Sequence, residues 1–237
     1  DLSEEPSVDE QAKIYKKVFN AYPNSKVVVR TLDAGSDKPI SYATLSSEEN
    51  PALGVRGLRI ARDNESLLTR QLDAIAQAAE SRGDDAETWV MAPMVATSKE
   101  AQWFAELCRE RGLTAGAMIE VPAAALMADK IMPHLDFVSI GTNDLTQYTM
   151  AADRMQGELA ELLSPWQPPV LNMIKATGMG GYATGNALAH AGVISGFDMT
   201  VEAALTKLHY LLSQPLMPEQ IRALMQQDLR GELSING

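Results

Sequence analysis

The sequence predicts an α/β protein built on a parallel sheet. The short, continuously apolar segment 27–29 is typical of a strand buried on both faces, and residues 137–140 form a second short apolar segment. Segments with helical periodicity lie between them, and strands that alternate with helices indicate βαβ units. Polar residues follow the strands directly, at the edge where α/β barrels and open α/β sheets bind ligands.

The expected elements follow one another in a regular order. An amphipathic helix is expected from Val8 to Ala21, because apolar residues recur there at helical spacing. The segment 23–25 ends this helix, and the first strand, residues 27–29, follows. Further strands are expected at residues 88–92, 117–119 and 137–140, with helices at residues 66–80, 98–111 and 122–132.

Composition limits the class of protein. The chain has 237 residues, 46% of them hydrophobic and 22% charged, as expected for a soluble globular protein with a sizeable core. It has no apolar run long enough for a membrane span, and its acidic N-terminus is no secretion signal. A single cysteine, Cys108, excludes an internal disulfide and predicts a cytoplasmic location. The net charge of −11 argues against a nucleic-acid surface.

Acidic side chains end two neighbouring strands. Glu120 follows the strand 117–119, and Asn143 and Asp144 follow the strand 137–140, about one βα unit later. Two carboxylates so placed suit a hard cation such as Mg2+, which usually shares substrate oxygens and keeps waters. The alternative is that these residues are ordinary helix caps or solvated carboxylates, and for Asp144 alone the two interpretations are about equal.

Three arginines are candidates for binding an anion. Arg30 ends the first strand, Arg154 follows Asp144 by ten residues, and Arg56 lies between strands. Arginines clamp phosphate and carboxylate oxygens bidentately, and Asn143 could donate a hydrogen bond to a phosphate. The alternative for Arg56 is a surface position. Together these groups predict a site for a small, doubly anionic, Mg2+-chelating substrate that loses a phosphoryl group.

The histidines and the cysteine do not join this set. His134 follows a proline before a strand, His190 lies among small residues, and His209 lies on an apolar helical face. Each is expected to be structural. Cys108 falls within a predicted helix far from any strand end and is expected to be a buried bystander.

Residues 139–149, with 152–154, resemble the signature of the phosphoenolpyruvate-utilising enzymes. The version ending in Tyr148-Thr149 is most similar to Enzyme I of the bacterial sugar phosphotransferase system. Supporting blocks lie at residues 29–33, 48–57, 91–94 and 119–125, in the family order. The resemblance extends from about Ser3 to Lys175, and pyruvate phosphate dikinase and phosphoenolpyruvate synthase share weaker versions of these blocks.

The resemblance implies that residues 1–237 are a phosphoenolpyruvate-binding domain with the (β/α)8 TIM barrel fold. In the family the phosphoryl group passes to a histidine on a separate domain and on to a phosphocarrier protein, the first step of sugar uptake. The barrel domain of Enzyme I also forms a homodimer. The implied roles are Mg2+ binding by Glu120 and Asp144, substrate binding by Arg30, Arg56, Asn143, Asp144 and Arg154, and catalysis by Arg30 and Arg154.

The chain also departs from the family. The phosphohistidine domain and the first two barrel strands are absent, so we expect an incomplete barrel and a piece of a longer protein. The chain is irregular around residues 175–186, where Gly180 stands in place of the cysteine that protonates the enolate. Either the chain is truly shortened, or residues are omitted between about Ala176 and Gly185. We favour the omission, because losing a barrel helix would remove much of the core, and it predicts a backbone discontinuity.

The leading functional prediction is a phosphoenolpyruvate–protein phosphotransferase domain that binds substrate weakly at best on its own and does not complete turnover. Two alternatives remain open. One is the barrel of a pyruvate phosphate dikinase or phosphoenolpyruvate synthase. The other is a degenerate module with a regulatory or dimerisation role.

Overall fold

Four parallel strands form the centre of the fold that the computed structural model describes, which covers residues 4–36, 39–44, 48–83 and 86–183. They are β1 (Val27–Arg30), β2 (Thr88–Ala92), β3 (Thr114–Ile119) and β4 (Phe137–Ile140). Their order in the sheet is the order of the chain. A doubly wound sheet reverses its strand order, whereas a barrel does not. The predicted α/β class is therefore confirmed, and the described sheet is a curled half-barrel.

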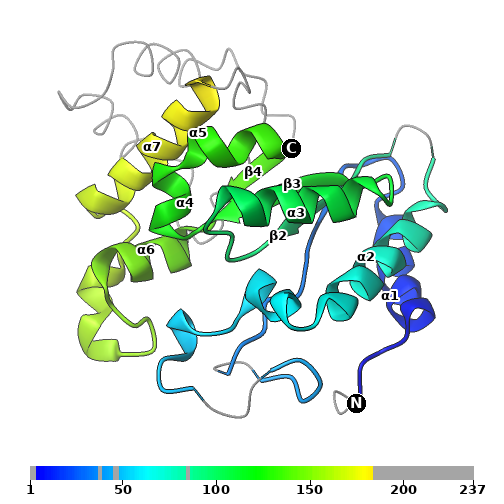
Figure 1. The fold of residues 1–237 in the computed structure, drawn as a ribbon, viewed down its shortest axis with the longest axis horizontal. Coiled ribbons are helices and arrows are strands. Elements are labelled where there is room, and N and C mark those ends of the chain that lie inside the picture. The colour runs from blue at the N-terminus through cyan, green and yellow to red at the C-terminus, as the bar shows by residue number, and fades with distance from the viewer. Residues whose placement is uncertain (1–3, 37–38, 45–47, 84–85, 184–237) are drawn as a thin grey trace. The chain divides into compact units, whose positions relative to one another are not determined.

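Helices occupy the connections between the strands (Figure 1). The α-helices are α1 (Val8–Ala21), α2 (Glu65–Ala79), α3 (Ser98–Arg109), α4 (Pro122–Leu126), α5 (Ala128–Ile131), α6 (Thr142–Met150) and α7 (Pro168–Ala183). Short 3-10 helices are η1 (Pro51–Leu53), η2 (Gly57–Arg62), η3 (Met132–His134) and η4 (Gly157–Leu163). Helices α1 and α2 pack together, and α7 packs on α4, α5 and α6.

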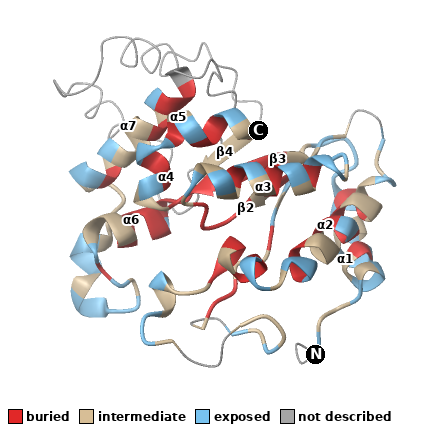
Figure 2. Cartoon of the chain, viewed as in Figure 1, coloured by how far each residue is buried: buried red, intermediate tan, exposed pale blue. Residues whose placement is uncertain are grey.

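Alternate strand residues pack against these helices. Val90 and Ala117 belong to one buried core cluster with the inward faces of α2 and α3, and Val29 packs against this cluster. These side chains share one face of the sheet, because successive strand side chains point to opposite faces. Figure 2 shows the buried residues along β3 and on the facing sides of the helices. The other face of the sheet carries Arg30 and, beyond the end of β3, Glu120. Arg30 reaches across β2 toward the end of β3, where its Nη1 lies 3.6 Å from the sulfur of Met118.

Local sequence signals explain where the helices begin. The Ser7 hydroxyl accepts a hydrogen bond from the Glu10 amide at 3.3 Å, and the Glu10 carboxylate accepts one from the Ser7 amide at 2.8 Å. Thr97 and Glu100 form the same capping box before α3. Such reciprocal bonds satisfy amides that the first helical turn leaves unpaired. The helix predicted for residues 8–21 is confirmed, as are the strands at residues 88–92 and 137–140.

Strand β3 begins at Thr114, earlier than the predicted start at Ala117. Gly116 weakens the apolar pattern of this strand, and the structure shows why a glycine stands there. A Cβ atom on Gly116 would lie 2.4 Å from Cε1 of Phe137, whose ring is stacked at a tilt on Trp89. The glycine therefore makes room for an aromatic pair.

The single helix predicted for residues 122–132 is wrong. It is broken into α4, α5 and η3, because Met127 leaves the helical conformation with φ −108° and ψ 23°. Pro133 lies within η3 and has no amide hydrogen to continue an α-helix. This part of the chain consequently turns in short steps between β3 and β4.

The expected discontinuity near residue 176 is also wrong for the described residues. Helix α7 continues without a break from Pro168 to Ala183. Gly180 does not end a strand: it is buried in α7, where an added Cβ would lie 2.5 Å from Cβ of Ala128 and 2.7 Å from the Asp129 amide nitrogen. The glycine therefore permits a close contact between α7 and α5. Gly180 consequently does not occupy the strand-end position that the resemblance assigned to a cysteine.

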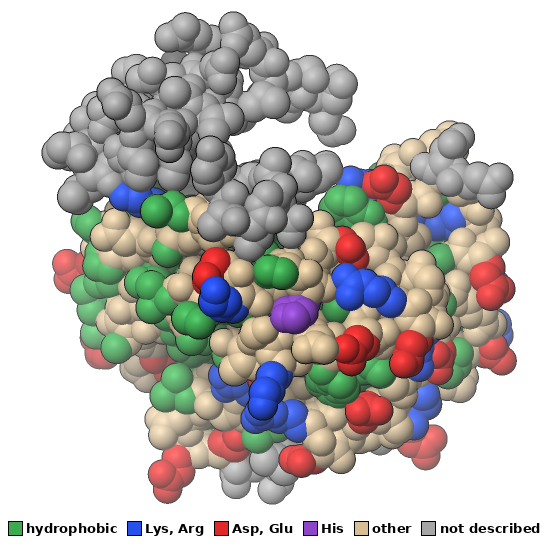
Figure 3. Space-filling model, turned by 45° about the horizontal axis from the view of Figure 1, so that its top comes forward, with side chains coloured by type: hydrophobic (Ala, Val, Ile, Leu, Met, Phe, Trp, Pro, Cys, Tyr) green, Lys and Arg blue, Asp and Glu red, His purple; other side chains and the backbone are tan. Residues whose placement is uncertain are grey.

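The molecular surface mixes both signs of charge. On the face drawn in Figure 3, basic and acidic side chains are interspersed with apolar ones. Within the described ranges, no helix combines the length and the apolar character that crossing a bilayer requires. The strand ends differ from this surface, because several of their charged side chains are buried.

Candidate functional site

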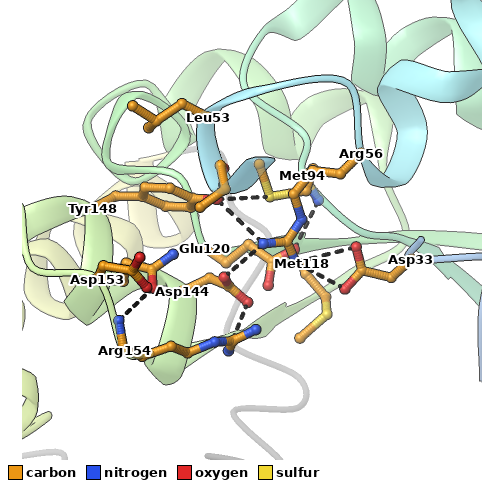
Figure 4. A network of polar contacts seen from close by, with 12 residues as sticks. Asp33, Leu53, Arg56, Met94, Met118, Glu120, Asp144, Tyr148, Asp153 and Arg154 are labelled. Carbon is orange, nitrogen blue, oxygen red and sulfur yellow. Dashed lines mark hydrogen bonds and ion pairs between the residues drawn. The ribbon is translucent and has the colours of Figure 1, made fainter. Parts of the chain in front are cut away.

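Five charged side chains of alternating sign meet at the carboxyl ends of the strands, as Figure 4 shows for four of them. In order they are Arg30, Asp33, Arg56, Asp144 and Arg154. Successive nitrogen–oxygen distances are 3.7, 3.1, 3.1 and 3.5 Å. The chain of contacts connects β1, the β1–α2 connection, α6 and the loop after α6, so residues distant in sequence converge on one site.

Arg56 lies in the middle of this series of ion pairs. Its Nη1 donates to Oδ1 of Asp144 at 3.1 Å, and its Nη2 lies 3.2 and 3.1 Å from the two oxygens of Asp33. The residue is 2% exposed, so the alternative of a surface arginine is wrong. Burial lowers the pKa of Arg56, but the charges of Asp144 and Asp33 outweigh burial and hold it above its ordinary value.

The backbone beside Arg56 is fixed by a glycine. Gly57 has a φ of 57°, and a Cβ atom there would lie 2.9 Å from Cγ of Met94. The Gly57 amide donates to the Ala34 carbonyl at 3.1 Å, and the Leu58 amide donates to the Pro93 carbonyl at 3.3 Å. These contacts tie the start of η2 to the ends of β1 and β2. The Arg56 side chain therefore starts from a well-defined position.

Glu120 lies directly after β3 and is 1% exposed. Its Oε1 accepts a hydrogen bond from the Met94 amide at 2.7 Å. The pKa of Glu120 is raised to about 7, mainly by burial and also by the charges of Asp144 and Asp33, which together outweigh the lowering effects of the Met94 hydrogen bond and of Arg56. The neighbouring strand end leaves room for this carboxylate, because a Cβ atom on Gly141 would lie 2.6 Å from its Oε2.

Asp144 and Asn143 occupy the first turn of α6 but differ in their environment. Asp144 is buried, and both of its carboxylate oxygens contact arginines, Oδ1 with Arg56 and Oδ2 with Arg154. Asn143 is exposed. The structure therefore brings Asp144 into the charged cluster and leaves Asn143 facing solvent beside it.

Glu120 and Asp144 are carboxylates that could hold a divalent cation. Glu120 and Asp144 are close enough for the charge of Asp144 to raise the pKa of Glu120, and a buried, mutually repelling carboxylate pair favours a cation between its members. Within the residues that the structure describes, no group of three or more acidic, histidine or cysteine side chains is placed to hold a metal. A site with two carboxylates matches Mg2+, which keeps waters and takes oxygens from its substrate.

Comparison with known proteins assigns this chain to a family. The family described as "PEP-utilising enzyme, PEP-binding domain", in which PEP is phosphoenolpyruvate, matches residues 1–228. The chain belongs to this family.

Relatives of this phosphoenolpyruvate-binding domain are longer proteins. The Phosphoenolpyruvate-protein phosphotransferase of Streptomyces coelicolor is 46% identical over 194 residues, which are 81% of this chain and 34% of the relative. The protein of the same name from Haloferax volcanii is 43% identical over 190 residues, 75% of this chain and 34% of its own length. The Multiphosphoryl transfer protein of Xanthomonas campestris is 44% identical over 179 residues, 73% and 21% of the two chains. The chain thus spans about one third or less of these relatives.

Two residues of this phosphoenolpyruvate-binding domain were not predicted as part of the site. Asp33 contacts Arg56 and Arg30, and the Tyr148 hydroxyl donates to the Ala52 carbonyl and lies 3.4 Å from Nη1 of Arg56. Both could have been predicted from the sequence. Asp33 follows a strand as Glu120 does, and Tyr148 lies four residues after Asp144 and hence on the same helical face. Burial raises the pKa of Tyr148 above its ordinary value.

The residues expected to be bystanders lie away from the cluster or outside the described residues. His134 lies in η3, and its Nε2 is 2.9 Å from the Ser98 hydroxyl. Cys108 is buried in α3, where burial raises the pKa of its thiol to about 12. His190 and His209 fall in the part of the chain that the structure does not describe.

Proposed function

We propose that this domain binds phosphoenolpyruvate together with Mg2+ and donates the phosphoryl group to a histidine of a partner domain. This is the first step of sugar uptake by the phosphotransferase system. The observation that carries the proposal is the alternating chain of arginines and carboxylates at the strand ends. Family membership supports the substrate, and the names of the relatives support the reaction class.

The arginines would divide the work of binding the substrate. Arg30 and Arg154 are partly exposed, with 44% and 27% of their side-chain surface accessible, whereas Arg56 is buried. We assign the outer pair to the phosphate and carboxylate of the incoming substrate, because arginine forks match both groups. Arg56 would supply fixed positive charge beneath them, and Asn143 would donate a hydrogen bond from the exposed start of α6.

Glu120 and Asp144 would hold the magnesium ion. When bound, Mg2+ neutralises the negative charge of the substrate's phosphoryl oxygens. Asp144 now contacts Arg56 and Arg154, so an anion that attracts these arginines would free carboxylate oxygens for the metal. Glu120 would become fully ionised beside the cation despite its raised pKa.

The phosphoryl transfer breaks the phosphorus–oxygen bond of phosphoenolpyruvate and forms a phosphorus–nitrogen bond to the acceptor histidine. The oxygen keeps the bond electrons, and the enolate of pyruvate remains, with a proton still required at its methylene carbon. Positive charge from the arginines stabilises the loose transition state of such a transfer. Cys108 cannot supply the proton, because it is buried in α3 and its pKa is raised to about 12.

The partners would be the phosphohistidine domain and the phosphocarrier protein of the system, in the cytoplasm, with the domain present as a homodimer. The relatives with phosphotransferase names favour this reading over a dikinase or synthase. The buried, mutually contacting charges at the strand ends favour this function over a degenerate module. Burying charged groups carries a desolvation penalty, and a site without a function would not need to keep them.

Isothermal titration with phosphoenolpyruvate in the presence of Mg2+ tests the proposal. The native chain should bind, and Glu120→Ala should weaken binding at least tenfold by removing a metal ligand. Glu106→Ala is the matched control, because Glu106 is an exposed glutamate on α3. Equal affinities for the native chain and Glu120→Ala would argue against the proposed site.

A further inference from the structure

Two carboxylates of the site bridge arginines in the same way, but only one has a part in the proposed reaction. Asp144 contacts Arg56 and Arg154, and Asp33 contacts Arg56 and Arg30. Asp144 would also bind the metal. Asp33 remains without a role, although its side chain is 4% exposed and its charge would repel an anionic substrate.

The backbone around Asp33 is anchored on both sides. The Leu32 amide donates to the Gln71 side-chain oxygen at 3.0 Å, which attaches this residue to α2. The Ala34 carbonyl accepts from the Gly57 amide at 3.1 Å, which attaches the next residue to η2. Asp33 therefore has little freedom to move with its arginine partner, and it can impose a position on that partner.

The contacts of Arg56 show what position is imposed. One terminal nitrogen lies 3.2 and 3.1 Å from the two oxygens of Asp33, and the other donates to Asp144 at 3.1 Å. A guanidinium is planar, so contacts at both terminal nitrogens fix its plane as well as its place. Without Asp33, the remaining contacts, with Asp144 at 3.1 Å and the Tyr148 hydroxyl at 3.4 Å, would both lie at Nη1, so the group could rotate about that nitrogen.

We propose that Asp33 is a positioning residue that holds the Arg56 guanidinium in the plane that selects phosphoenolpyruvate over simpler phosphate anions. This inference rests on the proposed function. The carboxylate weakens attraction for every anion alike, since its charge opposes that of Arg56. A fixed Arg56 also holds Asp144 and, through Asp144, the partly exposed Arg154 in place. This arrangement benefits only a ligand whose phosphate and carboxylate match it. Asp33 therefore lowers general anion affinity and increases discrimination.

The test compares two ligands on the same chain. Phosphoenolpyruvate and inorganic phosphate are titrated separately, each with Mg2+, and the ratio of their dissociation constants is recorded. For Asp33→Asn the discrimination ratio should fall at least tenfold, with phosphate bound as tightly as by the native chain or more tightly. Asp73→Asn is the matched control, because Asp73 pairs with Arg111 at 2.6 Å on the surface. It should keep the native ratio.

A second variant separates charge from position. Asp33→Glu keeps the negative charge but moves it by one methylene, so it should also reduce discrimination without tightening phosphate. If Asp33→Asn does not fold, the discrimination ratio of Asp33→Glu tests the positioning role in its place. An unchanged ratio in a folded Asp33 variant, or a proportional loss of both affinities, would overturn the positioning role. A native chain that does not prefer phosphoenolpyruvate over phosphate would refute the proposed function itself, and the inference with it.

Discussion

Replacing Glu120 by glutamine should stabilise the chain when Mg2+ and substrate are absent. Glu120 is buried, and its pKa is raised from 4.5 to about 7, so the folded state holds the proton more tightly than the unfolded state. As pH rises from 4.5 to 7, the unfolded chain ionises this group first and the native state loses stability. Glutamine stays neutral and keeps an oxygen that can accept the Met94 hydrogen bond.

The pKa difference sets the magnitude. A rise from 4.5 to about 7 corresponds to about 3 kcal/mol, since one pKa step is worth about 1.4 kcal/mol. The full effect should be present at pH 8, where the carboxylate is ionised in both states. At pH 5 most of the penalty is relieved, and we expect an advantage of about 1 kcal/mol for Glu120→Gln.

Urea unfolding at pH 5 and pH 8, with a chelator present, measures this difference. The free energy of unfolding of Glu120→Gln should exceed that of the native chain, and the excess should grow with pH. Glu106→Gln, at an exposed position, should match the native chain at both values. A native chain as stable as Glu120→Gln at pH 8 would refute the reasoning that a buried ionised carboxylate is held here at a cost to the fold.

Three further predictions concern single positions. Gly57→Ala should lower the free energy of unfolding by about 1–2 kcal/mol, because φ is 57° there and Met94 crowds the added Cβ; in urea titrations Gly83→Ala, at an open position, should lose much less. Gly180→Ala should cost about 1–3 kcal/mol through the clash with Ala128 and the Asp129 backbone, and a gain in melting temperature would contradict this packing of α7. The Cys108 thiol should not react with a disulfide reagent at pH 8 until the chain unfolds, because it is buried and its pKa is raised to about 12; fast reaction of the native chain would be inconsistent with its burial.

The sequence was sufficient for the strands and for most charged members of the site. β-branched runs such as Val27-Val28-Val29 carry their own signal, and βα units bring successive strand ends to one edge. This placed Glu120 and Asp144 together. Closure into an eight-stranded barrel stays a prediction, because the described sheet has four strands.

What the sequence did not predict depends on contacts between distant segments. Local signals could have placed Asp33 and Tyr148 near the site, but their pairings with Arg56 span 23 and 92 residues, and no local periodicity encodes a contact at such separations. Gly180 looked like a substituted strand-end residue, whereas its role depends on how closely α7 approaches α5. Asn143 and Asp144 are adjacent in sequence, yet only the fold decides that Asp144 is buried and Asn143 exposed.

The central claim is that the carboxylates and arginines at the strand ends form one site for phosphoenolpyruvate and Mg2+. Titration of the native chain with phosphoenolpyruvate, with Mg2+ and again with a chelator, tests it most directly. We expect measurable binding with Mg2+ and at least tenfold weaker binding with the chelator, because Glu120 and Asp144 would then repel the anion. Equal affinity under both conditions would contradict a shared site.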